Sequence, residues 1–185
     1  MKRTKIFLRE HSTECALIAV TVVLFFLLTY PLVFSFHKAL IGTLLSTAGD
    51  QFLFYWNYWW IRFAILDLHT NPFLTDWVFL PYTNVLVMHT LMPLQGILSL
   101  PFQLLHLPIP LIMNTFLLLS FVIGALGMYK TVFLLSRDRA ASFAAALLFT
   151  FSPIILNRLP GHYAFTIIWY VPWVLYHTIA LFSNP

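Results

Sequence analysis

Charged residues, glycine and cysteine are all scarce in this 185-residue chain. Only 9% of the residues are charged, whereas 61% are hydrophobic and the mean hydropathy is +0.86, far above what a soluble domain tolerates. The single cysteine, Cys15, excludes an intrachain disulfide and is interpreted as a packing residue. The six glycines form no phosphate-binding loop. We therefore expect an integral membrane protein.

The histidines and the net charge exclude two further classes of partner. The histidines are scattered, without the close spacing that binds zinc, so we predict no zinc site. No other cofactor is predicted. The net charge of +4 comes mostly from the N-terminal leader and one later turn. We attribute this charge to membrane topology and to contact with membrane lipids, and we predict no nucleic-acid partner.

The first apolar run, residues 15–36, is long enough to cross a bilayer, which takes roughly 20 residues. It follows a leader, residues 1–14, whose basic residues the positive-inside rule assigns to the cytoplasm. The run is longer than a signal-peptide core and has no small-residue cleavage site, so we interpret it as an uncleaved anchor. The sequence thus predicts a bacterial or archaeal-type cytoplasmic membrane and a cytoplasmic N-terminus.

Three later segments also have the length and composition of membrane spans: residues 110–135, 140–156 and 165–182. Lys130, Arg137 and Arg139 bracket the turn between the first two of these segments, which assigns that turn to the cytoplasm. Arg158 and His162 then lie in an external loop.

The segment 88–106 is apolar but contains Pro93 and Pro101, which interrupt helical hydrogen bonding. We favour a juxtamembrane or re-entrant element there, and a fifth span remains an alternative. The predicted fold is an all-α, polytopic bundle of transmembrane helices with four to five spans. Residues 1–185 form one membrane domain, in which residues 37–109 are a large external loop with interfacial helices and residues 110–185 hold the further spans.

Within that loop, residues 50–66 contain neither proline nor glycine and are predicted to be helical. One face of this helix is aromatic: Phe52, Trp56, Trp59 and Phe63. A second face carries polar tips: Gln51, Tyr55, Tyr58 and Arg62. Because Trp and Tyr favour the headgroup level, we expect the helix to lie along the outer interface.

The residues of this region each have a structural and a functional interpretation. Asp50 precedes the helix, where an acid either caps the N-terminus or serves a reaction. The aromatic residues suit a membrane belt or core packing as well as a ligand. Arg158 suits a lipid headgroup, and His162 suits a turn beside Gly161.

The wider pattern resembles a known family. It comprises Gly49-Asp50-Gln51, Trp56 and Trp59, Asn71 to Asp76, Leu80-Pro81-Tyr82, Asn114, Arg137-Asp138-Arg139, Ser152-Pro153 and Gly161-His162. Over essentially all 185 residues this arrangement is similar to the N-terminal part of the GT-C superfamily of membrane glycosyltransferases, which use polyprenyl-phosphate sugars. Such proteins have one span, a large external loop with a catalytic acid, and then spans joined by short loops.

The resemblance implies that Asp50 either acts as general base on an acceptor hydroxyl or orients that hydroxyl, and we favour the general base. The turn-like setting of Asp76 makes it a weaker candidate. The family's second external loop, which often carries an acidic ligand, corresponds to residues 157–163, where this chain has Arg158 and His162 and no carboxylate. This departure argues against a divalent metal ion.

The remaining candidate residues would bind the donor. Arg158, with His162 or His89, would stabilise the charge of the leaving phosphate. Tyr55, Trp56, Tyr58 and Trp59 would supply a stacking surface for a sugar or an isoprenoid chain.

Other interpretations remain beside the enzyme. Complete members of the superfamily have many more spans, so we expect a fragment, a module without activity, or a site that a second polypeptide completes. The alternative function is a non-catalytic accessory subunit of a larger membrane protein complex. A channel or transporter is weaker, because the predicted spans carry almost no central ionisable residues.

Overall fold

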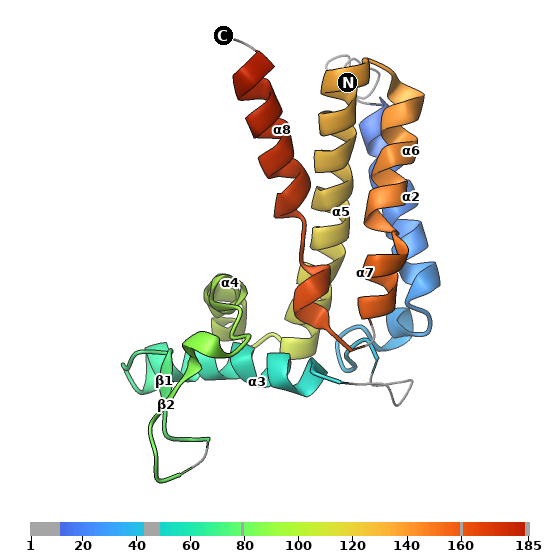
Figure 1. The fold of residues 1–185 in the computed structure, drawn as a ribbon. Helices are drawn as coiled ribbons and strands as arrows, with labels where there is room; N and C mark the ends of the chain where they lie inside the picture. The colour runs from blue at the N-terminus through green and yellow to red at the C-terminus, as the bar shows by residue number, and fades with distance from the viewer. Residues whose placement is uncertain (1–11, 43–48, 79, 160, 184–185) are drawn as a thin grey trace. The chain divides into compact units, whose positions relative to one another are not determined.

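The computed structural model describes residues 12–42, 49–78, 80–159 and 161–183 (Figure 1). Its helical content of 71%, against 2% strand, confirms that the protein is mainly helical. Most of the predicted leader, residues 1–11, lies outside the described residues.

The fold divides into two compact units, and each is described by itself. The described residues of the first unit fall within Met1–Val33, Leu117–Arg158 and Phe165–Pro185. Those of the second unit fall within Phe34–Phe116 and Leu159–Ala164. That residues 1–185 act as one membrane domain stays a prediction.

The first unit contains α2 (Ser12–Leu28), most of α5 (Ile109–Ser136), α6 (Arg139–Thr150), α7 (Pro153–Arg158) and α8 (Tyr170–Ser183) (Figure 1). Leu17 of α2 packs in one cluster with Ala125 and Tyr129 of α5 and with Ala146 of α6. The two alanines let the helices approach closely, as small residues do in membrane bundles.

Hydrogen bonds connect α8 to α5. The Thr131 hydroxyl donates to the Pro172 carbonyl oxygen at 2.9 Å, and the Trp173 indole donates to the Ile123 carbonyl oxygen at 2.9 Å. Gly127 makes room for the indole, since a Cβ atom at this position would lie 2.8 Å from the Trp173 ring. These two polar groups of α8 thereby find partners within the protein, as apolar surroundings require.

The turn between α5 and α6 is only two residues long. After Ser136 ends α5, Arg137 adopts a left-handed backbone conformation with φ of 56°. Asp138 then caps α6, because its Oδ1 accepts hydrogen bonds from the backbone N–H groups of Ala140 and Ala141. A short acceptor at this position satisfies the unpaired donors of the first helical turn.

Three segments are long and apolar enough to cross a membrane: Ile109–Ser136, Arg139–Arg158 and Tyr163–Phe182. They coincide with the last three predicted spans, whose length and composition are therefore confirmed. The first predicted span, residues 15–36, covers most of the 17-residue helix α2, which begins earlier at Ser12, and then a short 3₁₀ helix, Leu32–Ser35. A count of four to five spans stays a prediction.

The second unit is built around α3 (Gln51–Arg62), which continues as a π-helical turn, η3 (Phe63–Asp67). This helix confirms the one predicted for residues 50–66. Two short antiparallel strands follow, β1 (Leu74–Thr75) and β2 (Asn84–Val85), in which Leu74 lies opposite Val85. The chain then passes through a 3₁₀ helix, η4 (Leu86–Met88), to α4 (Pro93–Leu104).

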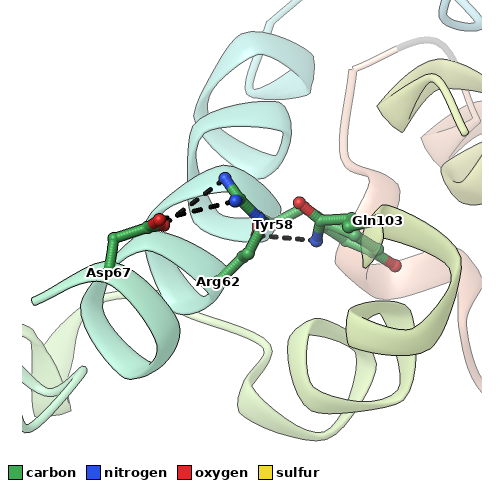
Figure 2. A network of polar contacts seen from close by, with 4 residues as sticks. All are labelled: Tyr58, Arg62, Asp67 and Gln103. Atoms are coloured by element: carbon green, nitrogen blue, oxygen red, sulfur yellow. Dashed lines mark hydrogen bonds and ion pairs between the residues drawn. The ribbon is translucent and has the colours of Figure 1, made fainter. Parts of the chain in front are cut away.

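Helices α3 and α4 pack closely against each other. A Cβ atom on Gly96 of α4 would lie 2.2 Å from Cδ1 of Ile61, so only glycine fits there without a shift. Figure 2 shows that Gln103 reaches from α4 to the backbone of α3, where its Nε2 donates to the Tyr58 carbonyl oxygen at 3.0 Å. Arg62 and Asp67 form an exposed ion pair at 3.4 Å beside this contact.

The segment 88–106 contains only the twelve residues of α4 as an α-helix. At 1.5 Å per residue such a helix is about 18 Å long, whereas the hydrocarbon core of a bilayer is about 30 Å thick. Pro93 lies in the first helical turn, where the missing N–H group leaves no hydrogen bond unmade. The length of α4 therefore disfavours a fifth span, and the juxtamembrane or re-entrant position stays a prediction.

Candidate functional site

Asp50 and His162 lie together in the second unit. Oδ2 of Asp50 is 3.1 Å from Nδ1 of His162, and the two side chains are 49% and 42% exposed. Asp50 directly precedes α3, yet its side chain makes no capping hydrogen bond. Capping therefore does not account for this carboxylate, which the structure instead brings to a second residue of the predicted site.

Backbone and side-chain contacts hold Asp50 and His162 next to each other. The Asp50 N–H group donates to the Gly161 carbonyl oxygen at 3.0 Å. Gln51 is fully buried, and its Nε2 donates to the Leu159 carbonyl oxygen at 3.1 Å. Gly49 permits this approach, because a Cβ atom there would lie 3.1 Å from the Gly161 carbonyl oxygen. The start of α3 is thus attached at two points to the segment that carries His162.

The exposure of the pair limits what it contributes to stability. A half-exposed contact of this kind is worth about 0–1 kcal/mol even between two charged groups, because water and side-chain entropy offset most of the attraction. Oδ1 of Asp50 makes no hydrogen bond with any described residue. The site thus presents a half-exposed carboxylate, one oxygen of which is held by an imidazole, an arrangement that suits proton transfer.

A second polar contact joins His89 to α3. Asn57 is fully buried, and its Nδ2 donates to the Thr90 carbonyl oxygen at 2.7 Å. This bond fixes the orientation of the amide, and Oδ1 of Asn57 then lies 2.9 Å from Nε2 of His89. Because an amide oxygen only accepts, Nε2 of His89 carries the proton. Burial lowers the pKa of His89, which favours the neutral ring. A neutral His89 compensates phosphate charge less well than the sequence interpretation expects.

The predicted aromatic residues differ in how much surface they leave. Trp56 stacks on Trp60 with the ring centroids 5.5 Å apart, and Trp59 stacks on Phe63 at 4.9 Å. Tyr55 is 39% exposed. These stacking contacts favour a packing role for Trp56 and Trp59. Tyr55, in contrast, keeps exposed ring surface that a ligand could contact.

Tyr58 is fully buried and leaves no surface for a sugar in this structure. Its hydroxyl lies 3.2 Å from that of Tyr163, which itself donates to the Met113 carbonyl oxygen at 2.8 Å. Tyr58 must therefore donate to Tyr163. Burial raises the pKa of Tyr58 well above its usual range, so the hydroxyl keeps its proton.

Arg158 belongs to the first unit, whereas the other candidate residues belong to the second. Its guanidinium carbon lies 5.5 Å from the centre of the Phe165 ring, a cation–π distance, and the side chain is exposed. Asp76, the weaker candidate base, is exposed in the loop after β1. Among the described residues, no group of three or more His, Cys, Asp or Glu side chains is suited to a metal ion.

Sequence reasoning missed two residues that build the site, Asn57 and Tyr163. An amide side chain in the middle of an aromatic helix was the available signal for Asn57. Comparisons with protein-family models, curated proteins and solved structures find no match. The chemistry of the site is therefore argued from its own residues.

Proposed function

We propose that this protein is a membrane glycosyltransferase of the GT-C type, which transfers a sugar from a polyprenyl-phosphate donor with Asp50 as the general base. One observation carries the proposal: an accessible carboxylate precedes α3, does not cap that helix, and is held by His162. Carboxylates in this role take the proton of an attacking hydroxyl.

In the proposed reaction, Oδ1 of Asp50 accepts the proton of the acceptor hydroxyl while the hydroxyl oxygen forms a bond to the anomeric carbon. The bond between that carbon and the donor phosphate breaks, and polyprenyl phosphate leaves with the bonding electrons. His162 acts as a positioning residue, because its contact with Oδ2 orients the carboxylate. That Arg158 compensates the charge of the leaving phosphate stays a prediction from the sequence.

The test measures transfer from a radiolabelled polyprenyl-phosphate hexose by membranes that contain the full chain. Asp50→Asn keeps the shape of the side chain and removes its basicity, so transfer should fall by about 10²–10⁴-fold, the usual contribution of a general base. Asp67→Asn is the matched control, because it also removes one exposed carboxylate from the second unit and Asp67 is not a candidate base. Equal transfer by wild type and Asp50→Asn would refute the proposed base.

A non-catalytic subunit of a larger membrane protein complex is the second candidate. It is favoured by the low burial of two candidate spans: 22% of the apolar window in Arg139–Arg158 is buried, and 17% of that in Tyr163–Phe182. Most of this surface is left for lipid or for partner helices. Absence of transfer by wild type, together with copurification of a stoichiometric membrane partner, would favour this function.

A further inference from the structure

A cavity of about 260 Å³ lies in the first unit, among the N-terminal end of α2, the last turns of α5 and the start of α6. Its polar lining consists mainly of Glu14, Tyr129, Lys130, Arg137, Arg139 and Tyr176. Neither Asp50 nor His162 belongs to it, so the cavity is separate from the candidate catalytic residues.

The lining carries an excess of positive charge. Nζ of Lys130 lies 3.1 Å from Oε1 of Glu14, and this pair is close to neutral. Arg137 and Arg139 are exposed, and neither guanidinium forms an ion pair with a described residue. Asp138, between them in sequence, does not line the cavity and uses its carboxylate to cap α6. Two arginines are therefore available to an anion.

Arginine pairs suit phosphate in particular. The planar guanidinium matches two phosphate oxygens at once, and such charge-assisted hydrogen bonds are stronger than neutral ones. The hydroxyl-bearing residues Tyr129 and Tyr176 also line the cavity and add possible donors to the same lining.

The apolar part of the cavity indicates that the phosphate belongs to a lipid. Phe133 and Leu134 contribute to the wall, and the neighbouring Leu135 is 65% exposed. These residues end the candidate span Ile109–Ser136, where lipid headgroups meet a transmembrane helix. The cavity volume of about 260 Å³ is below the usual range for drug-sized ligands. A lipid headgroup would therefore fit inside it, whereas the acyl chains would remain outside.

We propose that this cavity binds the phosphate headgroup of an anionic phospholipid, with Arg137 and Arg139 as its ligands. The bound lipid would occupy the end of the helix bundle at which α5 turns into α6. Lys130 is paired with Glu14 and therefore contributes less to phosphate binding.

The experiment measures bound lipid by native mass spectrometry of the purified full chain in detergent, with phosphatidylglycerol or phosphatidylcholine added. Wild type should retain phosphatidylglycerol in preference. Arg137→Gln and Arg139→Gln should each weaken retention about fivefold, the effect of one basic residue near a lipid phosphate. Lys38→Gln is the matched control, because it removes one exposed cation that does not line the cavity. It should leave retention unchanged.

A second variant tests the role of the acid. Glu14→Gln releases Lys130 and should strengthen phosphatidylglycerol retention, whereas a purely structural ion pair would leave it unchanged or reduce it. Unchanged thermal unfolding of the arginine variants would show that lost retention is not lost folding. The proposal is overturned if the Arg137→Gln/Arg139→Gln double variant retains phosphatidylglycerol like wild type, or if both lipids are retained equally.

A competition with inorganic phosphate distinguishes the source of the phosphate group. For a lipid site, excess phosphate should leave most phosphatidylglycerol bound, because the apolar wall contacts the lipid alone. Binding of inorganic phosphate that depends on Arg137, together with no preference for phosphatidylglycerol, would assign the cavity to a soluble phosphate and overturn the lipid assignment.

Discussion

The hydroxyl of Tyr58 donates to the hydroxyl of Tyr163, and the two oxygens lie 3.2 Å apart in the core of the second unit. The hydroxyl of Tyr163 in turn donates to the Met113 carbonyl oxygen. The two tyrosines are therefore unequal: one is a terminal donor, and the other is both acceptor and donor. Their substitutions should differ accordingly.

Tyr58→Phe should lower the free energy of unfolding by about 1 kcal/mol, because Tyr163 keeps its own acceptor. Tyr163→Phe should lower it by about 1–3 kcal/mol, because the buried Tyr58 hydroxyl then has no acceptor. Denaturant unfolding in detergent measures both values. Tyr55→Phe, at an exposed position on the same helix, should have almost no effect. A larger loss for Tyr58→Phe than for Tyr163→Phe would contradict the direction of donation.

Alkaline pH should destabilise the second unit through Tyr58. Its pKa is raised by burial, so the folded protein keeps a proton that the unfolded chain releases above a pH of about 10. The unfolded state then binds fewer protons, and stability falls as pH rises through that window, whereas it is independent of this group below it. Unfolding curves at several alkaline pH values should show a weaker dependence for Tyr58→Phe. Identical pH dependence in both proteins would argue against this linkage.

Gly96→Ala should destabilise the packing of α3 on α4. The added methyl group would overlap Cδ1 of Ile61, and overpacking of this kind costs about 1–3 kcal/mol. Ile61→Val removes the overlapping atom, so the double variant should recover part of the loss in a thermodynamic cycle. Gly124→Ala is the control, because its nearest neighbour would lie at an ordinary 3.6 Å. Strictly additive effects of the two substitutions would show that this contact is not the cause.

Asp50→Asn should separate function from folding. Because both side chains of its pair with His162 are about half exposed, the substitution should change the free energy of unfolding by no more than about 1 kcal/mol. The same variant should lose sugar transfer. Thermal unfolding beside the transfer assay makes the comparison, and a strongly destabilised variant would mean that Asp50 is a structural residue.

His89 should titrate below the usual histidine range. Its pKa is lowered by burial, and its proton lies on Nε2 toward Asn57. Nuclear magnetic resonance of ¹⁵N-labelled histidine should report a neutral Nε2–H ring at neutral pH. Asn57→Ala should remove the preference for this tautomer. A positively charged His89 at neutral pH would contradict the assignment and favour a role in phosphate binding.

The sequence predicts the helical elements better than it predicts their surroundings. Length and hydropathy are local properties, and they suffice for the three long spans and for α3. The face that carries Gln51 and Tyr58 was predicted to present polar tips at the interface, yet both residues are fully buried. Helical spacing shows which residues share a face, but what covers that face depends on segments far away in the chain.

The candidate site illustrates the same limit. Asp50 and His162 were each selected from local motifs, but 112 positions separate them in sequence, and only the fold brings them into contact. The role of Asn57 was not visible in the sequence, because it depends on the contact between α3 and the segment after β2 that carries His89. Contacts between distant residues follow from the packing of whole elements, which residue spacing does not encode.

The two-residue turn at Arg137 and Asp138 also has a consequence for membrane insertion of the two helices that it joins. The turn joins two helices that are long and apolar enough to cross a membrane, and its charged residues are costly to place in hydrocarbon. The sequence predicts that this turn lies in the cytoplasm, and with that topology the two helices would enter the membrane as one helical hairpin. Asp138, whose carboxylate caps the start of α6, would then stabilise the bend of that hairpin.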